Sequence, residues 1–284
     1  MKFAFFGTPD LAVTVLSVLE QNQLVPELVV TNPDAPVGRK QILTPSPVKL
    51  WAQARDIAVF QPLTLKDKTQ LEPLITQTWD LFVVVAYGKL IPEWLINLPK
   101  HQTLNLHPSL LPKLRGASPI RSAILNDQQE TGVTIMLLDA ELDHGPILAQ
   151  KPVPLPTWPI KGRELDQLLA EAGGRLLSQT MSDWIAGQIT PKDQDHTQAT
   201  FCTKITKDLS ELSIDPYHLP QDHEAYQTYL KICAFDVWPE TFFMYQGRRI
   251  KIKAAHLDNN QNLVIDTIVP EGKNAIDFQT YFNL

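Results

Sequence analysis

Leu81-Phe82-Val83-Val84-Val85-Ala86-Tyr87 is the longest apolar run of the chain and the stretch that decides its fold. A short run that is apolar at every position is typical of a parallel strand buried on both faces, because a half-exposed strand would alternate. The run is far too short to span a bilayer, which needs about 20 apolar residues. It predicts an α/β protein built on a Rossmann-like, mainly parallel sheet.

Strand-like and helix-like segments alternate on both sides of this run, from Lys2 to about Leu155. This alternation is the signature of βαβ units whose helices cover both faces of a sheet. The other expected strands are Lys2–Phe6, Leu24–Val30, Ala58–Phe60, Thr103–His107, Val133–Leu138 and Ile147–Val153. The expected helices are Leu11–Glu20, Pro47–Arg55, Lys66–Thr76, Pro119–Asn126 and Arg163–Ala186, the last interrupted or relaxed at Gly173-Gly174.

A second, smaller domain is expected in the C-terminal third of the chain. Residues 189–198 are rich in Pro, Gln, Asp and Thr and predict a linker. We therefore expect a catalytic domain over residues 1–188 and a small domain over residues 199–284. Within the small domain we expect a helix over Glu224–Ala234, strands over Arg248–Ala255 and Asn262–Ile268, and a turn over Val269–Lys273.

Composition indicates a cytoplasmic protein with a large core and no metal. The chain has 284 residues, 44% of them hydrophobic, and only two cysteines, which lack the spacing of a disulfide framework or a zinc site. The apolar residues Phe3 to Phe6 are interrupted by Pro9 and Asp10, unlike those of a signal peptide. The net charge of −6 argues against a sequence-independent nucleic-acid binder but leaves room for a local basic patch. We expect a monomer that does not bind a membrane.

Polar side chains end the strand Thr103-Leu104-Asn105-Leu106-His107. Asn105 and His107 are two residues apart, so an extended strand directs both side chains to one face. Pro108 cannot continue a hydrogen-bonded ladder and ends the strand. Open α/β sheets place ligands at the carboxyl ends of their strands. Taken singly, each residue has a plainer explanation, a turn-capping amide and a half-buried structural histidine.

Further motifs occur in a fixed order along the chain. They are Gly7-Thr8-Pro9-Asp10-Leu11-Ala12, Pro33–Arg39, Ser46-Pro47-Val48-Lys49, Val85-Ala86-Tyr87-Gly88, Asn105–Pro112, Leu114–Ile120, Glu130–Met136 and Leu142-Asp143-His144-Gly145. This ordered set closely resembles the bacterial methionyl-tRNA formyltransferases, a family that uses formyltetrahydrofolate. The resemblance runs to about Thr203 and continues more weakly to the end. It implies transfer of a formyl group from 10-formyltetrahydrofolate to the amino group of methionyl-initiator tRNA in translation initiation.

The resemblance also implies roles for individual residues. Asn105 and a protonated His107 would donate hydrogen bonds to the formyl oxygen as negative charge develops on it, and Asp143 would support the imidazolium and move protons. No covalent nucleophile is required. The residues expected to contact the folate are Ser109, Leu110, Leu111, Pro112, Tyr87 and Gly88.

Three competing assignments are weaker. His144 rivals His107 as the catalytic histidine, but its place in a loop favours a role at the surface or at the lip of the site. Ser109 as a hydrolase nucleophile lacks the Gly-x-Ser-x-Gly elbow. Gly7-Thr8-Pro9-Asp10 has one glycine where a dinucleotide-binding turn needs three, and no P-loop lysine, so it is interpreted as a helix start.

Two regions are candidates for contacts with the tRNA. In the family, the loop over residues 31–47 reaches toward the acceptor end, which makes Arg39 the expected contact and leaves Lys40 as a solvated charge. In the small domain, Arg249, Lys251 and Lys253 alternate with isoleucines, so a strand would direct all three cations to one face. A phosphate-contacting stripe and a charged, solubilising edge strand explain this pattern equally well.

The C-terminal region departs from the family pattern. The segment between Ala254 and Val269 is short, so we expect a shortened domain of the oligonucleotide-binding (OB) type rather than a full five-stranded barrel. Residues 204–284 contain 8 Lys and Arg against 11 Asp and Glu, a difference of −3 that argues against strong docking to the tRNA body. This keeps open a formyltransferase acting on a small amine, such as an amino-sugar nucleotide. The loop with Arg39 favours tRNA, and a non-enzymatic folate- or RNA-binding module would be preferred only if Asn105, His107 and Asp143 were not all present.

Overall fold

The computed structural model describes residues 1–38 and 40–284, and within them the chain divides into two compact units. Unit 1 consists of Met1–Gly116, Thr131–Pro154 and Gln167–Phe201. Unit 2 consists of Ala117–Glu130, Leu155–Asp166 and Cys202–Leu284. Each unit therefore combines segments that lie far apart in the sequence.

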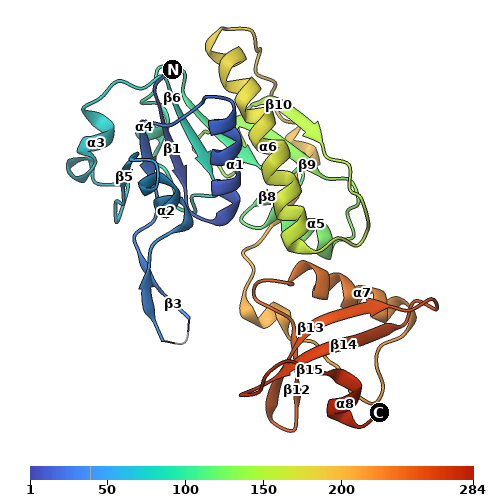
Figure 1. Ribbon diagram of the computed structural model, residues 1–284. Coiled ribbons are helices and arrows are strands. Elements are labelled where there is room, and N and C mark those ends of the chain that lie inside the picture. Colours follow the sequence, from blue (N-terminus) through green and yellow to red (C-terminus); the bar gives the residue numbers. More distant parts are fainter. Residues whose placement is uncertain (39) are drawn as a thin grey trace. The chain divides into compact units, whose positions relative to one another are not determined.

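Unit 1 contains the mainly parallel sheet that the sequence predicts (Figure 1). The strand order is β10-β9-β7-β6-β1-β2-β5. Strands β7, β6, β1, β2 and β5 run parallel, whereas β9 is antiparallel to β7 and β10 is antiparallel to β9. The strands are β1 (Phe3–Gly7), β2 (Leu28–Val30), β5 (Ala58–Phe60), β6 (Leu81–Val85), β7 (Thr103–His107), β9 (Gly132–Leu137) and β10 (Ile147–Pro152).

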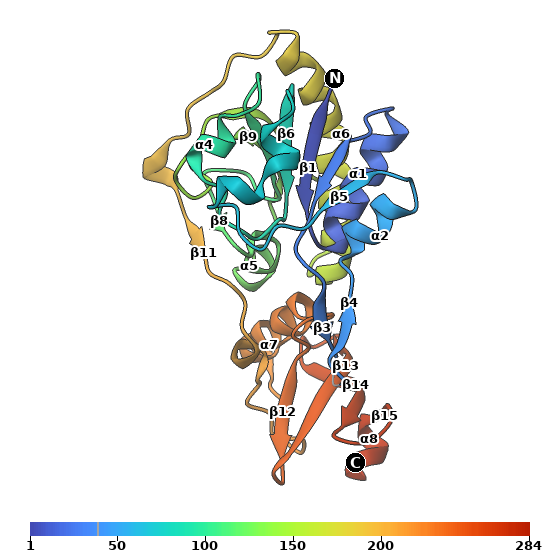
Figure 2. The same ribbon diagram turned by 90° about the vertical axis from the view of Figure 1, so that its left-hand side faces the viewer.

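Helices cover both faces of this sheet, as Figure 2 shows from the side. On one face, α1 (Asp10–Gln21), α2 (Pro47–Gln53) and α6 (Gly162–Ile185) pack on strand residues that include Phe5 and Val83. On the other face, the short helices α3 (Glu72–Ile75) and α4 (Glu93–Ile96) pack on the alternate residues, Phe6 and Phe82 among them. Every residue of β1 and β6 is buried, which explains why both strands are continuously apolar.

Local sequence explains where the first helices begin. Asp10 lies in the first turn of α1, where its negative charge interacts favourably with the positive end of the helix dipole. Apolar residues spaced three and four positions apart form the buried face of the helix. Helix α2 begins with Ser46, whose hydroxyl accepts a hydrogen bond from the backbone N–H of Lys49 at 3.1 Å, and has Pro47 at its first position. Both helices fix the chain that leaves the carboxyl end of a strand.

Helix α6 is continuous through Gly173 and Gly174, so the predicted interruption is wrong. The glycines serve packing instead. A Cβ atom on Gly173 would lie 2.7 Å from the side chain of Leu106 in β7, and one on Gly174 would lie 2.8 Å from Val18 in α1. The two glycines thus allow a close approach of α6 to strand β7 and to helix α1 rather than marking a break.

Two other local predictions differ from the structure. Residues 66–76 form only a 3-10 turn at Lys68–Gln70 and the short helix α3, because the Asp67 carboxylate caps the backbone N–H of Thr69 and Pro73 follows. The loop over residues 31–47 contains a small hairpin, β3 (Ala35–Val37) and β4 (Ile42–Thr44), whose strands are exposed. Figure 1 shows this hairpin extending away from the sheet.

Unit 2 contains a small antiparallel sheet, as the shortened C-terminal domain predicts. Its order is β12-β13-β14-β15. The isoleucines of β13 and β14 and the phenylalanines of α8 form its buried core. The elements are α5 (Pro119–Leu125), α7 (Asp222–Ala234), β12 (Phe242–Tyr245), β13 (Arg248–Leu257), β14 (Leu263–Pro270), β15 (Ile276–Asp277) and α8 (Phe278–Phe282); the short strands β8 (Arg115–Gly116) and β11 (Phe201–Cys202) pair separately.

Candidate active site

Strand β7 supplies the two polar side chains at the centre of the candidate site. Asn105 and His107 are 8% and 4% exposed and share one face of the strand, as predicted. Leu104 and Leu106 occupy the opposite face and belong to the core that α6 covers. The alternation of β7 therefore separates a packing face from a chemical face within five residues.

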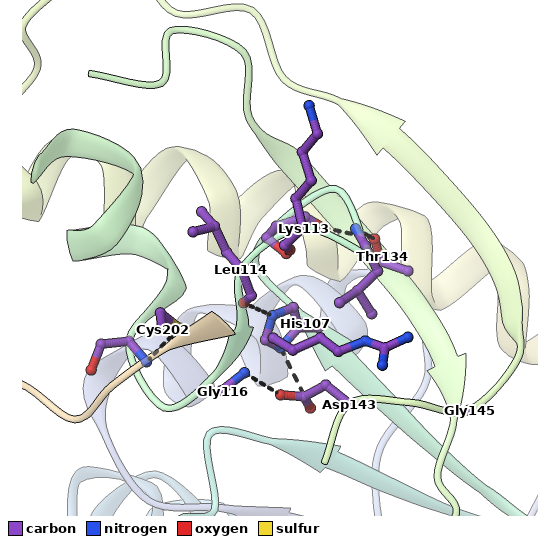
Figure 3. Close-up of polar contacts among 12 residues, drawn as sticks. His107, Lys113, Leu114, Gly116, Thr134, Asp143, Gly145 and Cys202 are labelled. Atoms are coloured by element: carbon purple, nitrogen blue, oxygen red, sulfur yellow. Dashed lines mark hydrogen bonds and ion pairs between the residues drawn. The ribbon is translucent and has the colours of Figure 1, made fainter. Parts of the chain in front are cut away.

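His107 lies between a backbone carbonyl and a carboxylate, which Figure 3 shows in close-up. Its Nε2 donates to the backbone carbonyl of Leu114 at 2.9 Å, and its Nδ1 lies 3.7 Å from Oδ1 of Asp143. A carbonyl oxygen can only accept, so Nε2 carries a proton. Nδ1 faces the carboxylate of Asp143 at a distance beyond hydrogen-bond range.

Asp143 is fixed through its second oxygen. Oδ2 accepts a hydrogen bond from the backbone N–H of Gly116 at 2.7 Å. Asp143 also has a positive φ of 48°, a left-handed conformation that is uncommon for residues other than glycine. The sequence prediction that Asp143 joins Asn105 and His107 is therefore matched by a close approach of Asp143 to His107.

Asn105 differs from its neighbour in having no internal partner. Within residues 1–38 and 40–284, its side-chain amide makes no hydrogen bond to another residue. An amide donor on a buried strand, two residues from a fixed histidine, is placed to bond an oxygen of a bound ligand.

The turn after β7 is braced by Thr134 of β9. The hydroxyl of Thr134 donates to the carbonyl of Ser109 at 2.7 Å and accepts from the N–H of Leu111 at 3.2 Å. Gln150 donates to the same hydroxyl and to the carbonyl of Leu111. The Ser109 hydroxyl donates to the carbonyl of Lys113 at 2.6 Å and the residue is 1% exposed, which does not suit the alternative role as a nucleophile.

The candidate folate residues divide into two kinds. Leu110 and Pro112 are half-buried in the braced turn, and Leu111 is buried. Tyr87 is 2% exposed, with its ring edge-on to Phe6 in the core, and burial raises the pKa of its phenol to about 12. Only its backbone reaches the carboxyl edge of the sheet, where Gly88 has a φ of 81°.

The carbonyl of Tyr87 is the centre of a small network between the ends of β1, β2 and β6. It accepts from the Asn32 amide at 3.0 Å and from the Thr8 hydroxyl at 3.3 Å. The other end of the Asn32 amide, Oδ1, is buried without a partner among the described residues. This acceptor lies at the point where the strand order reverses, the place where open α/β sheets bind ligands.

His144 lies to one side of this arrangement. Its Nδ1 is 2.7 Å from a carboxylate oxygen of Asp139, and its ring stacks on His196 with centroids 4.1 Å apart. Its side chain is 30% exposed. These contacts fit the predicted position at the lip of the site rather than a rival to His107.

The site includes residues that sequence reasoning did not assign. Thr134 and Gln194 are buried and donate to backbone carbonyls of the site, and the buried guanidinium of Arg115 donates to Oε1 of Gln194. Arg115 falls within the motif Leu114–Ile120, which carries the family resemblance, and this motif is the sequence signal that points to it. Gln194 lies in the segment predicted as a linker and gave no periodic or compositional signal.

Of the residues predicted to contact tRNA, the structure describes those on β13, whereas Arg39 lies outside the described residues. On β13, Ile250 and Ile252 are buried and the three cations occupy the outer face, as the alternation predicts. Both Lys251 and Lys253 form ion pairs with Glu240, while the guanidinium of Arg249 lies over the ring of Phe242.

The base of the β3–β4 hairpin is held by one buried hydrogen bond and one partly exposed ion pair. The hydroxyls of Thr31 and Ser46 are 2.7 Å apart, and Lys49 forms an ion pair with Asp34 at 2.7 Å. Hydrogen bonds from Gln61 and Lys49 lower the pKa of the Asp34 carboxyl. The two strands therefore leave the sheet from a fixed base.

Within residues 1–38 and 40–284, no group of three or more His, Cys, Asp or Glu residues could hold a metal ion. None of the helices in the described chain combines the length and apolar character needed to cross a bilayer.

Comparison with known proteins identifies close relatives. A family model described as formyl transferase matches residues 1–181. The methionyl-tRNA formyltransferase of Halalkalibacterium halodurans is 40% identical over 252 residues, covering 89% of this chain and 77% of the relative. That of Caldicellulosiruptor saccharolyticus is 39% identical over 278 residues, covering 95% and 85%.

A solved structure shares the fold at lower identity. It is an N-formyltransferase from Helicobacter canadensis in complex with folinic acid and dTDP-3-aminofucose. It is 20% identical, with a TM-score of 0.64, and the match covers 91% of this chain and 88% of the other.

Proposed function

This chain belongs to the formyl transferase family, in which its curated relatives are methionyl-tRNA formyltransferases, and from that premise we propose that it formylates methionyl-initiator tRNA with 10-formyltetrahydrofolate. The observation that carries this proposal is about 40% identity over nearly the whole chain to enzymes of that name. The protein is a folate-dependent transferase by family, and the particular folate and acceptor are the proposed details.

The chemistry follows from the three site residues. The amine of methionine attacks the formyl carbon, and a tetrahedral intermediate forms with negative charge on the former carbonyl oxygen. Asn105 donates an amide N–H to that oxygen, which accounts for an amide without an internal partner. His107 donates Nδ1–H to the same oxygen, since 3.7 Å to Asp143 is too long for a competing hydrogen bond.

Asp143 completes the proton balance. The attacking nitrogen loses a proton as the new carbon–nitrogen bond forms, and the folate nitrogen gains one as the old bond breaks. Before the transfer, the charge of the Asp143 carboxylate supports the imidazolium; the carboxylate then takes the first proton and returns it to the leaving nitrogen, directly or through a water. The hydrogen bond from Gly116 keeps its second oxygen in place during both transfers.

The folate lies at the carboxyl edge of the sheet, between the Tyr87-Gly88 backbone and the turn over residues 109–112. Leu110 and Pro112 present half-buried apolar groups to a flat ring. The buried Oδ1 of Asn32 is an acceptor that a ligand N–H would satisfy. Ser109 and Leu111 contribute mainly by shaping the turn.

We assign recognition of the tRNA to Arg39 in the loop between β3 and β4, and to Arg249, Lys251 and Lys253 on β13. The first lies in the proposed catalytic domain, residues 1–188, and the others lie in the proposed C-terminal domain, residues 199–284. The fixed base of the hairpin supports this role, because a contact that orients the amine must be positioned as well as charged. The ion pairs of Lys251 and Lys253 with Glu240 leave Arg249 as the cation of the stripe best able to bond a phosphate.

The test is a comparison of acceptors. Purified protein is incubated with 10-formyltetrahydrofolate and either methionyl-initiator tRNA or a dTDP-amino sugar. We expect formyl-methionyl-tRNA and no formylated sugar, with transfer reduced by Arg39→Ala even at low salt. Efficient formylation of the sugar, with no transfer to charged tRNA at any salt concentration, would overturn the proposal in favour of the small-amine alternative.

A further inference from the structure

Residues 192–200, here called the strap, run along the site within unit 1. At one end Lys192 exchanges two backbone hydrogen bonds with Ile147 of β10, at 2.8 and 2.9 Å. At the other end Thr200 bonds to the backbone of Leu114 and Arg115. The strap is thus fixed at both ends, to β10 of the sheet at Lys192 and to the segment 114–115 at Thr200.

Gln194 is the buried centre of the strap, with 5% of its surface exposed. Its Nε2 donates to the carbonyls of Asp143 and Gly145, at 2.9 and 2.8 Å. Its Oε1 accepts from Nε and Nη2 of Arg115, at 3.2 and 2.7 Å. Both ends of the amide are used, so Gln194 joins the Asp143 loop to the Arg115 segment in one orientation only.

The Asp143 loop needs such external support. Asp143 itself has a positive φ, and a Cβ atom on Gly145 would lie 2.1 Å from the carbonyl oxygen of Leu137. A backbone held in this strained and closely packed form persists only when its surroundings over-determine it. The two hydrogen bonds from Gln194 are the contacts from the strap that do so.

Thr200 supports the other side of His107. Its hydroxyl accepts from the N–H of Leu114 at 2.9 Å, and its carbonyl accepts from the N–H of Arg115 at 2.8 Å. The carbonyl of Leu114 in turn accepts from His107 Nε2. The strap therefore holds both groups that face the imidazole, the Leu114 carbonyl through Thr200 and the Asp143 carboxylate through Gln194.

We propose that Gln194 and Thr200 are positioning residues for the formyl transfer, which fix the Leu114 carbonyl and the Asp143 carboxylate on either side of the His107 imidazole. Neither residue contacts the reacting atoms in this scheme; each acts through Asp143 or Leu114. The proposal rests on the proposed function of Asn105, His107 and Asp143, and it adds residues from a segment that composition assigns to a linker.

Two pairs of variants separate positioning from stability. Gln194→Glu keeps the acceptor for Arg115 but replaces the donor to the Asp143 loop by an oxygen, whereas Gln194→Ala removes both. Thr200→Val removes the hydroxyl that accepts from Leu114, whereas Thr200→Ser keeps it. Gln198→Ala is the matched control, since Gln198 is an exposed glutamine of the same strap.

Steady-state kinetics with methionyl-tRNA and 10-formyltetrahydrofolate, together with thermal unfolding, give the readout. We expect Gln194→Glu to lower kcat about a hundredfold, as displacement of a reacting group by about 1 Å can do, with little change in KM for either substrate. Thr200→Val should lower kcat less, and Thr200→Ser should restore it. Gln198→Ala should match the wild type.

The outcomes distinguish this inference from the proposed function. A folded Gln194→Glu variant with wild-type kcat, or a Thr200→Ser variant no better than Thr200→Val, overturns the positioning role while formylation by the wild type stands. A wild type that does not formylate methionyl-tRNA overturns the proposed function itself. In that case dissociation of 10-formyltetrahydrofolate and transfer to the alternative amine are measured with the same variants, and an unchanged kcat there also overturns the role of the strap.

Discussion

In unit 1 the polar side chains of the site are buried and bonded mainly to backbone atoms, whereas in unit 2 the cations of β13 lie on the outer face and are bonded to another side chain. His107 and Asp143 each bond a backbone group of the segment 114–116. Lys251 and Lys253 share the carboxylate of Glu240 instead. The difference matches two tasks, since a reaction needs fixed atoms and recognition of a polyanion needs charge that adapts.

This comparison predicts that changes in unit 1 affect the rate of transfer, and changes on β13 affect the use of tRNA and its salt dependence. The largest effect should come from Asn105→Ala or His107→Ala. Each should lower kcat by about a hundredfold to a thousandfold, because removal of one donor to an oxyanion costs about 2.7–4 kcal/mol. Folate affinity, measured by fluorescence titration, should change little. Near-normal turnover of either variant would remove that residue from the site.

Asp143→Asn should have the next largest effect. The amide keeps an acceptor for the N–H of Gly116 but has neither the charge that supports an imidazolium nor the basicity to accept a proton. We expect kcat to fall on the order of a hundredfold, the lower range for loss of general acid–base catalysis. The melting temperature should stay close to that of the wild type. Full activity of a folded variant would make Asp143 a turn residue only.

Gly173→Ala tests packing behind the chemical face. The added methyl would lie 2.7 Å from Leu106, in the strand that carries Asn105 and His107. Overpacking of this kind costs roughly 1–3 kcal/mol, partly offset by the higher helix propensity of alanine. Denaturant unfolding should show a lower midpoint. A gain in stability would mean that α6 and β7 move apart easily, contrary to the close contact described.

Glu240→Gln should have the smallest effect and the most specific signature. Loss of the shared carboxylate releases Lys251 and Lys253, so the affinity for tRNA should rise and its dependence on salt should steepen, by about one unit of slope for each new phosphate contact. The matched variant Arg249→Ala should flatten the slope. Equal slopes for wild type and both variants would mean that β13 carries charge for solubility alone.

The same carboxylate has a pH signature. Burial raises the pKa of Glu240, but hydrogen bonds from Lys251 and Lys253 outweigh it and hold the pKa below the usual value of 4.5. A lowered pKa stabilises the fold above pH 4.5, and this contribution is lost as the pH falls through the value in the folded state. The stability difference between wild type and Glu240→Gln should therefore shrink on acidification below pH 4.5.

Much of unit 1 could be predicted from sequence because its signals are local. Strand β7 begins and ends where predicted, and the alternation within it places Asn105 and His107 together. The proline that follows ends the strand at the carboxyl edge of the sheet. The approach of Asp143 was implied only by the family resemblance, because contact across 36 positions of sequence has no periodic signature.

The residues that were not predicted depend on contacts between distant segments. Gln194 lies among polar residues typical of a linker and becomes buried only because Arg115 and the Asp143 loop use both ends of its amide. Glu240 neutralises Lys251 and Lys253, which follow it by 11 and 13 positions. The sequence pattern of three cations on β13 therefore overstates the positive charge that is free to bind a phosphate. The pair Gly173 and Gly174 is typical of a helix break, and the sequence does not show their close packing against Leu106 and Val18.

The division between fixed chemistry and adaptable recognition is tested most directly by single-turnover formylation with enzyme in excess over methionyl-tRNA. As enzyme concentration increases, the observed rate for Arg249→Ala should rise to the wild-type plateau, because weaker binding is overcome by mass action. The rate for Asn105→Ala should reach a plateau on the order of several hundredfold lower, because its defect lies in the transition state. A wild-type plateau for Asn105→Ala, or a depressed plateau for Arg249→Ala, would contradict the account.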